Sequence, residues 1–466
     1  MIKKKTIFLS VVVSISLIII IAFIITIYLK KSSNYKFPDC NIILISIDTL
    51  RADHLPCYGY YRNTAPNISK FAKEGILFEQ VVDTGGGTLP VHISMFTSLY
   101  PSVHKILADN KRTLEEERIT LTEQLKQKGY KAAAFTDGGF LNAKFGFSQG
   151  FDIYDDEGGN FVKIMPKVYN WLTKNKNKKF FLFIHTYDVH SGFEQLPYDS
   201  PEGYNHLYTK DYSGDFTGCL NGICASNFLV WINENLKSKG KKPGDIFSNL
   251  ENDLRYIRAL YDGGINYVDK EIGLLFKKFK KLGIYNKSLI IITSDHGEEF
   301  LEHGLMLHWQ NYEETARVPL IIKFPSSIIK SKRIFKLVST IDLMPTILDI
   351  VDIPLNDQAQ GLSLMPLILK NELKRNFVII QNTIRTEEWK YFSRGELYKI
   401  KEDKFEKRNV INKYPKIQKR LKRLLRAVIK RDKLLFERFQ KGIKANRQIK
   451  MTKKEIDKLK ALGYLN

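Results

Sequence analysis

Cysteine is scarce in this sequence, with four residues among 466. Their spacing contains no zinc-type pairs, which argues against a structural zinc site held by cysteines. Cys219 and Cys224 enclose a short loop, and a disulfide between them is reasonable in an oxidising compartment. Cys40 and Cys57 are expected to be free.

Acidic residues are also in deficit, because 73 Lys and Arg against 50 Asp and Glu leave a formal net charge of +23. The sequence has no internal repeat, no low-complexity tract and no nucleic-acid-binding module, so we expect no nucleic-acid partner. Much of the charge lies in residues 416–447, where apolar and basic residues alternate at near-helical spacing. We favour a packed amphipathic helix with a solvated basic face. Binding to anionic lipid or a polyanion is the alternative.

Only one stretch is long and apolar enough to span a membrane. Residues 6–29 carry no charge and are flanked by lysines at 3–5 and 30–31. The run is longer than the core of a typical cleaved signal peptide and lacks an obvious cleavage site. We therefore expect a signal anchor in residues 1–31, although the nearly balanced lysines do not fix its orientation.

Three near-continuous apolar runs, residues 41–47, 179–184 and 288–294, have the composition of strands buried on both faces. Each run ends in acidic or imidazole side chains: Asp48, then His185 with Asp188 and His190, then Asp295 with His296. Ligands of open α/β sheets bind outside the carboxyl ends of the strands, so these side chains predict one shared site. Asp and His together suit a divalent metal ion. Taken singly, Asp48 or Asp188 could equally be a turn or helix-cap residue.

A hydroxyl group is placed to join this site. Thr88 follows three glycines and precedes Pro90 at the predicted start of a helix, where free backbone N–H groups face a bound anion. Thr88 is therefore a candidate nucleophile.

The chain resembles the sulfatase family within the alkaline phosphatase superfamily. The resemblance covers nearly everything after the first forty residues, and its main segments are Asp48-Thr49-Leu50-Arg51-Ala52-Asp53, Thr88-Leu89-Pro90, Asp295-His296-Gly297-Glu298-Glu299, Arg317-Val318-Pro319-Leu320 and Gly361-Leu362-Ser363-Leu364. It implies an α/β fold with a mixed, mostly parallel sheet flanked by helices and a smaller C-terminal subdomain. We expect a catalytic domain at 32–375 and a subdomain with a basic helical tail at 376–466.

The resemblance also implies roles for individual residues. Asp48, Thr88, Asp295 and His296 match the metal site, and Thr88 matches the nucleophile. His190 and His308 are expected to act in catalysis and to contact the substrate, together with His92 and His185 as further substrate-binding candidates. A second metal bound by Asp188, His190 and His308 is an alternative, although the spacing does not clearly match two-metal relatives.

Three positions depart from the family pattern. The nucleophile motif of sulfatases has Cys or Ser followed by Pro and then Arg, whereas this chain has Thr88, Pro90 and His92. Thr49 replaces the second of two paired aspartates, and His296 replaces an asparagine common in calcium sulfatases. Imidazole favours Zn²⁺ or Mn²⁺, although the resemblance also allows Ca²⁺.

Threonine cannot become the aldehyde whose hydrate expels sulfate. A threonyl phosphoester, by contrast, can be hydrolysed by attack at phosphorus. The expected activity is therefore metal-dependent hydrolysis of a sulfate or phosphate ester, with phosphoester or phosphonoester chemistry favoured. The alternatives are a transferase that moves a phospho-headgroup from lipid to glycan through Thr88, and a non-catalytic scaffold. Family habit places the catalytic domain outside the cytoplasm on a single-pass anchor.

Residues 191–252 are polar and glycine-punctuated, which predicts a loop-like insertion that either borders the active site or is a surface excursion without a substrate role. An amphipathic helix is expected to begin near Tyr261.

Overall fold

The computed structural model describes residues 35–440 except 110–111, 193–195, 215, 221, 248 and 327–328, and in addition 449, 451–453, 455–456 and 459. The predicted anchor at residues 6–29 lies outside these residues. Within them, no helix combines the length and the apolar character needed to cross a membrane.

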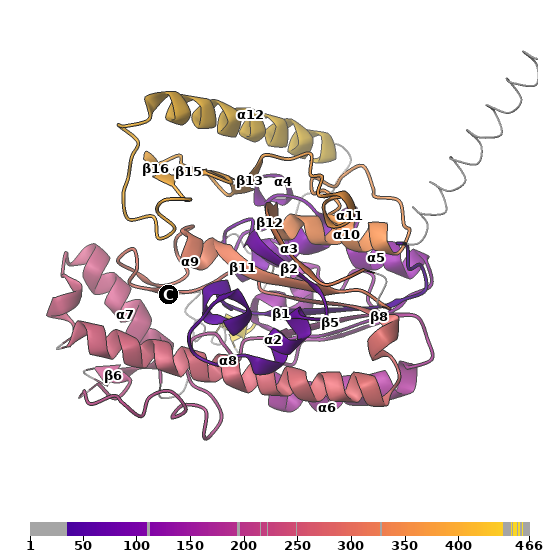
Figure 1. The fold of residues 1–466 in the computed structure, drawn as a ribbon, viewed down its shortest axis with the longest axis horizontal. Coiled ribbons are helices and arrows are strands. Elements are labelled where there is room, and N and C mark those ends of the chain that lie inside the picture. The colour runs from indigo at the N-terminus through magenta and orange to yellow at the C-terminus, as the bar shows by residue number, and fades with distance from the viewer. Residues whose placement is uncertain are drawn as a thin grey trace, which may run out of the picture.

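An eight-stranded sheet forms the centre of the molecule, in the order β12-β2-β11-β8-β1-β5-β3-β4 (Figure 1). Its strands are β1 (Asn41–Ile47), β2 (Ile76–Val82), β3 (Lys131–Phe135), β4 (Ile153–Asp155), β5 (Phe180–Thr186), β8 (Ser288–Thr293), β11 (Arg317–Lys323) and β12 (Lys332–Ser339). The central strands β1, β5 and β8 are buried on both faces, as their apolar sequences predict. All neighbouring pairs are parallel except those of β11, which runs antiparallel to β8 and β2. The predicted mixed, mostly parallel sheet is confirmed.

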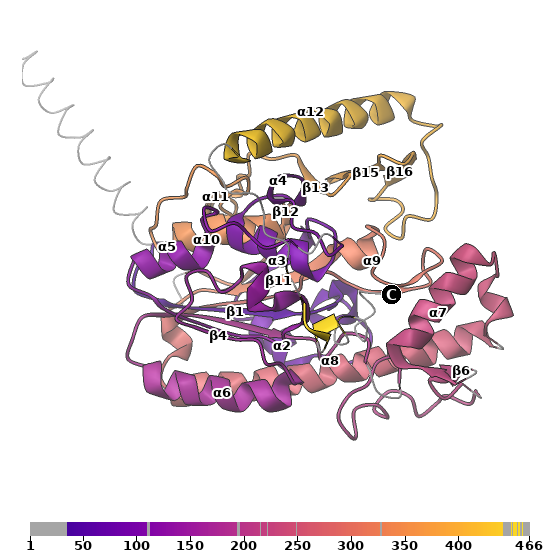
Figure 2. The same ribbon diagram turned by 180° about the vertical axis from the view of Figure 1, so that it is seen from behind.

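Helices cover both faces of this sheet (Figures 1 and 2). One face packs against α2 (Pro66–Ala72), α6 (Asn160–Asn175), α7 (Ala225–Ser238) and α8 (Leu250–Lys281). The other packs against α3 (Thr88–Thr97), α5 (Leu121–Gln127), α10 (Leu343–Ile350) and α11 (Met365–Lys370). The remaining short helices are α4 (Pro101–His104), α9 (Glu313–Ala316), and the 3-10 turns η1 (Ala52–His54), η2 (Pro56–Tyr58), η3 (Gly139–Leu141), η4 (Ala143–Phe145), η5 (Pro243–Asp245), η6 (Tyr285–Lys287) and η7 (Thr340–Asp342).

The segment 191–252 is more ordered than its composition predicts. It holds a two-stranded hairpin, β6 (Cys219–Leu220) and β7 (Ile223–Cys224), followed by helix α7. The apolar residues of α7 lie at helical spacing and pack into the core, which outweighs the polar character of the surrounding chain. The predicted disulfide between Cys219 and Cys224 is present and closes the hairpin. The helix expected to begin near Tyr261 begins earlier, at Leu250 in α8.

The C-terminal subdomain is a four-stranded antiparallel sheet with one long helix. The strands are β13 (Phe377–Ile380), β14 (Thr383–Thr386), β15 (Trp389–Phe392) and β16 (Glu396–Lys399), and the helix is α12 (Pro415–Gln440). Leu421, Leu425 and Val428 of α12 are buried against this sheet and against Tyr100. The favoured interpretation of a packed amphipathic helix is therefore confirmed for α12.

Candidate active site

Three central strands bring their carboxyl ends to one place. Parallel pairing places Ser46 of β1 opposite His185 of β5 and Thr293 of β8, so the residues that follow emerge at the same edge of the sheet. Asp48 and Asp295 lie there, both with no solvent-exposed surface. The shared site predicted from three strand ends is therefore present as a geometric cluster.

Thr88 is the first residue of α3 and reaches the same cluster from a glycine loop. Its Oγ1 donates to Oδ2 of Asp48 at 3.1 Å and lies 3.2 Å from Nε2 of His296. Gly86 in the preceding loop has φ +99°, and a Cβ there would lie 2.8 Å from the Nε2 of Gln381. Glycine is therefore required at this position by both conformation and close approach.

Gln381 comes from the turn between β13 and β14, so the C-terminal subdomain completes the wall around the glycine loop. Its backbone N–H donates to the carbonyl oxygen of Thr84, and its side chain accepts from Asn311. The sequence offered no signal for this contact, because Gln381 lies almost three hundred residues after the loop that it closes.

Asp48, Asp295 and His296 form a candidate cation site. One ligand atom from each lies within 4.8 Å of the others, and all three residues are buried. Among the described residues, Oδ1 of Asp48 and Oδ2 of Asp295 are buried without a hydrogen-bond partner. A buried carboxylate oxygen without a partner costs free energy of folding, and a bound cation would remove that cost. The donor set therefore fits a divalent cation.

The protonation pattern agrees with that fit. Burial, together with the charge of Asp295, raises the pKa of Asp48 well above its ordinary value. Nδ1 of His296 lies 2.9 Å from the carbonyl oxygen of Gly297, so this nitrogen carries the proton and Nε2 is left as a ligand. One nitrogen and two carboxylates suit Zn²⁺ or Mn²⁺ better than Ca²⁺.

His92 lies behind the nucleophile. Its Nδ1 is 2.9 Å from the carbonyl oxygen of Thr88, one helical turn earlier, and its Nε2 is 2.9 Å from Oγ of Ser46. Burial lowers the pKa of His92, so the ring is neutral, donating through Nδ1 and accepting from Ser46. This residue was expected to contact the substrate, but both ring nitrogens are engaged and the side chain is fully buried. The contacts of His92 instead indicate that it stabilises the first turn of α3.

His185 sits between His92 and Asp48. Its Nε2 lies 3.3 Å from Oδ2 of Asp48, and its ring meets that of His92 edge to face at 5.1 Å. Ligand atoms of His185, His92 and Asp295 form a second group within 4.8 Å. Burial lowers the pKa of His185 well below its ordinary value. The neutral ring donates through Nε2 to Asp48, and its side chain, like that of Asp48, has no solvent-exposed surface.

His190 and His308 approach from a different side. Their rings are 5.2 Å apart, and the ring of His308 lies 4.4 Å from that of His296. Nδ1 of His308 is 3.4 Å from Oε1 of Glu298, and Nδ1 of His190 is 3.1 Å from the carbonyl oxygen of Ser191. Through His296, which contacts Thr88, the two rings adjoin the cluster, and their contact with a substrate stays a prediction.

Helix α7, which lies in the segment expected to be loop-like, supports the loop that carries His308. His308 follows the hairpin of β9 (Glu299–Phe300) and β10 (Met306–Leu307). Asn233 of α7 exchanges two hydrogen bonds with the backbone of Met306, at 2.7 and 2.9 Å. The 191–252 segment thus borders the site, as one of the two interpretations expected.

The described structure lends no support to the alternative second metal site of Asp188, His190 and His308. Oδ2 of Asp188 accepts the backbone N–H of Phe161 at 2.9 Å, at the start of α6, and also bonds the hydroxyl of Thr186. Across the described ranges, no candidate metal group contains Asp188, His190 or His308. Asp188 follows a strand end as a ligand would, but its side-chain oxygen accepts a backbone N–H at the start of α6 instead.

Two functional candidates were missed in the sequence. Ser46 contacts the ring of His92 from within β1, where it is the only hydroxyl in an otherwise apolar run. Glu298 is fully buried beside His308, and burial raises its pKa to about 8. The strongly acidic segment after Asp295 was the available signal for Glu298.

Comparisons with known proteins agree with this architecture. A family model described as Sulfatase matches residues 40–353, and one described as N-sulphoglucosamine sulphohydrolase, C-terminal, matches residues 301–431. Arylsulfatase K of Bos taurus is 31% identical over 204 residues, which cover 38% of this chain and only 38% of that protein. N-acetylglucosamine-6-O-sulfatase of Bacteroides thetaiotaomicron is 24% identical, covering 83% of this chain and 85% of that protein.

Solved structures show the same fold. One, described as in complex with its substrate D-glucosamine-2-N,6-O-disulfate, has a TM-score of 0.65 and 22% identity, covering 85% of this chain and 98% of its own. The phosphonate monoester hydrolase of Agrobacterium radiobacter has a TM-score of 0.66 and 20% identity, covering 84% of this chain and 96% of its own.

Proposed function

The chain belongs to the sulfatase family, and from that premise we propose that it hydrolyses phosphate or phosphonate esters in preference to sulfate esters, with Thr88 as nucleophile. The observation that carries the proposal is the position of the Thr88 hydroxyl, 3.1 Å from Asp48 and 3.2 Å from His296 at the start of α3. The fold does not decide the ester, because the similar structures include both a protein bound to a sulfated sugar and a phosphonate monoester hydrolase.

In the first step the transferred group moves to Thr88, and the surrounding residues have separate roles. Asp48 accepts the hydroxyl hydrogen bond, and N–H groups of the first turn of α3 face the developing negative charge. A divalent cation held by Asp48, Asp295 and His296 would lower the pKa of the Thr88 hydroxyl and offset charge on the transferred group. His190 and His308 contact the non-bridging oxygens of that group. Asp48 takes the hydroxyl proton as Oγ1 bonds phosphorus and the bond from phosphorus to the leaving oxygen breaks. The leaving alkoxide takes a proton from water, because burial lowers the pKa of His190 and His308 and keeps both rings neutral.

The second step explains the preference for phosphorus. Water attacks the phosphorus of the Thr88 ester, the bond to Oγ1 breaks, and the Thr88 hydroxyl is regenerated. A threonyl sulfate has no second hydroxyl with which to expel sulfate by collapse to an aldehyde. The side chain therefore supports turnover of phosphoesters more readily than turnover of sulfate esters.

We further propose that residues 6–29 anchor the protein and that its catalytic domain lies outside the cytoplasm. The disulfide between Cys219 and Cys224 supports an oxidising compartment. Thiol labelling of the protein in intact cells would contradict this location if both cysteines were reduced.

Substrate comparison tests the activity. The purified full chain is supplied with Mn²⁺ or Zn²⁺ and assayed on an aryl sulfate, an aryl phosphate monoester, a phosphodiester and a phosphonate monoester. We expect kcat/KM to be highest for a phosphorus ester. A higher value for the aryl sulfate would overturn the assignment, and a protein that binds no metal and turns over none of the four would favour the scaffold alternative.

A further inference from the structure

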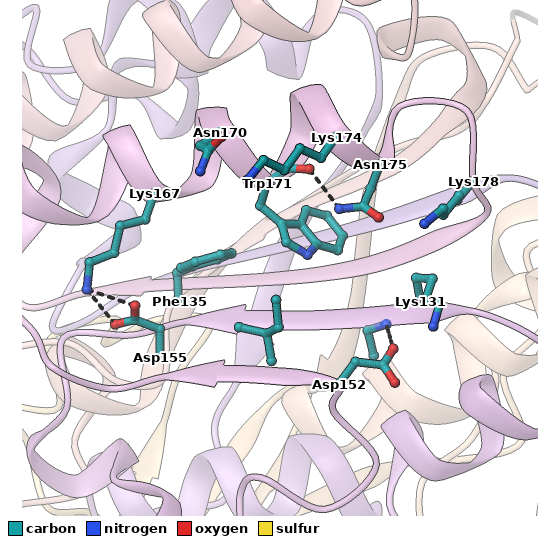
Figure 3. A pocket seen from close by; sticks show the side chains of 12 residues that line it. Lys131, Phe135, Asp152, Asp155, Lys167, Asn170, Trp171, Lys174, Asn175 and Lys178 are labelled. Carbon is teal, nitrogen blue, oxygen red and sulfur yellow. Dashed lines mark hydrogen bonds and ion pairs between the residues drawn. The ribbon is translucent and has the colours of Figure 1, made fainter.

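A basic groove lies at the edge of the central sheet, remote from Thr88. It has a volume of about 420 Å³ and runs between α6, the edge strand β4 and its neighbour β3. Figure 3 shows the ring of Trp171 pointing from α6 toward the strands, with Lys178 further along the chain and Lys131 on the strand opposite. Lys174 of α6 also lines the groove.

The charges in this groove are unbalanced. Four lysines and two aspartates line it. Asp155 is paired with Lys167 at 2.7 Å, and Asp152 with Lys126 at 3.2 Å. Within the described part of the chain, Lys131, Lys174 and Lys178 have no ion-pair partner, and all three are exposed. Three neighbouring ammonium groups around one concave surface suit an anionic ligand.

The floor of the groove is apolar. Phe135 and Trp171 are almost fully buried, and Ile153 is 45% exposed. A ligand that fits both parts combines a phosphate with hydrocarbon, as the headgroup and glycerol region of an anionic phospholipid do.

The chain enters the fold at the same end of the sheet. The Tyr130 hydroxyl donates to the carbonyl oxygen of Pro38 at 3.2 Å, and Nζ of Lys179 lies 3.3 Å from Asp39. Tyr130 and Lys179 are the sequence neighbours of Lys131 and Lys178. The stretch from residue 31, where the proposed anchor ends, to residue 38 reaches at most roughly 25 Å. With residues 6–29 as an anchor, as proposed above, this reach would bring the basic end of the groove near the bilayer.

We propose that this groove binds the headgroup of an anionic phospholipid in that bilayer, through Lys131, Lys174 and Lys178. The proposal rests on the anchor proposed above, but not on the chemistry of Thr88. The active site lies at the carboxyl ends of the strands, opposite the basic end of the groove. Binding of a headgroup in the groove would therefore turn the active site away from the membrane surface.

Hydrogen exchange of the full chain in lipid nanodiscs tests the proposal. Discs contain phosphatidylcholine alone or with phosphatidylglycerol, and amide exchange is followed in peptides covering residues 171–178. We expect phosphatidylglycerol to slow this exchange by about fivefold, as expected for the attraction of a basic segment to an anionic surface. The triple variant Lys131→Gln, Lys174→Gln and Lys178→Gln should lose the effect.

A matched control removes three exposed lysines at the other end of the molecule, Lys237, Lys239 and Lys241, beside the end of α7 (Figure 1). This variant should keep the full effect of phosphatidylglycerol. The proposal is overturned if the lipid leaves exchange unchanged, if the groove variant keeps the effect, if the control loses it equally, or if inorganic phosphate with phosphatidylcholine discs reproduces it. Failure of the chain to enter discs at all would instead refute the anchor.

Discussion

Nε2 of His185 lies 3.3 Å from Oδ2 of Asp48, the same carboxylate oxygen that accepts the hydroxyl of Thr88. One buried imidazole thus fixes the orientation of a carboxylate that serves both the nucleophile and the candidate cation site. The neighbouring His92 holds the backbone of Thr88 from behind. The two histidines act through Asp48 and Thr88 and are positioning residues.

Replacing His185 should therefore weaken metal binding. In His185→Phe the ring packing is kept, but Asp48 loses its donor. Partners of metal ligands typically contribute 10–100-fold to affinity, so we expect the dissociation constant for Mn²⁺ or Zn²⁺ to rise by about that factor. Isothermal titration calorimetry, in which the metal ion is added to metal-free protein, measures the dissociation constant. Unchanged affinity in a variant with a normal melting temperature would remove His185 from this role.

Changing His296 should alter which metal supports activity. His296→Asn replaces an imidazole nitrogen with an amide oxygen, which a hard cation prefers. We expect turnover with Zn²⁺ or Mn²⁺ to fall by more than about tenfold relative to turnover with Ca²⁺. Activity is compared after metal removal and reloading with each ion separately. An unchanged order of metals would show that His296 is not a ligand.

Asp188 gives the stability of the protein a pH dependence. Burial raises its pKa from 3.8 to about 7. The folded state therefore binds a proton more tightly than the unfolded state, so this contribution is complete below about pH 4 and is lost as the pH rises toward 7. The loss is on the order of 3–4 kcal/mol. Denaturant unfolding between these pH values should show it in the wild type, whereas Asp188→Asn should flatten the profile. An equal slope in both proteins would contradict the assignment.

The packing of α12 predicts a contrast between two leucines of one helix. Leu425 is 3% exposed and Leu434 is 58% exposed. Leu425→Ala should lower the free energy of unfolding by about 2–3 kcal/mol because it leaves a cavity. Leu434→Ala should change it by less than about 0.5 kcal/mol. Chemical denaturation measures both, and similar losses would mean that α12 does not dock through Leu421, Leu425 and Val428.

The positions of Asp48, Asp295 and His296 could be predicted because local sequence determines them. Each follows an apolar run rich in isoleucine, which has the composition of a strand buried on both faces, and parallel strands end at a common edge. The start of α3 at Thr88 is also determined by local sequence, because three glycines precede it and Pro90 follows in the first turn.

The remaining contacts depend on the tertiary fold. Asp188 has the sequence context of a metal ligand, but its side chain accepts the backbone N–H of Phe161 at the start of α6. His92 is buried because every residue of α3 is covered, by apolar residues of the central strands and by α10 and η7. Gln381 reaches the glycine loop only after the C-terminal sheet has docked. None of these partners is near in sequence, so no local pattern indicates them.

The central claim is that Thr88 forms a covalent ester with the transferred group. The most direct measurement is mass spectrometry of the Thr88 peptide after acid quenching of the enzyme during turnover of an aryl phosphate, compared with Thr88→Ser and Thr88→Ala. The account predicts a phosphorylated peptide in the wild type and in Thr88→Ser. In Thr88→Ala it predicts neither the modified peptide nor turnover above about a thousandth of the wild-type rate, with metal content largely retained. Undiminished turnover by Thr88→Ala would contradict it.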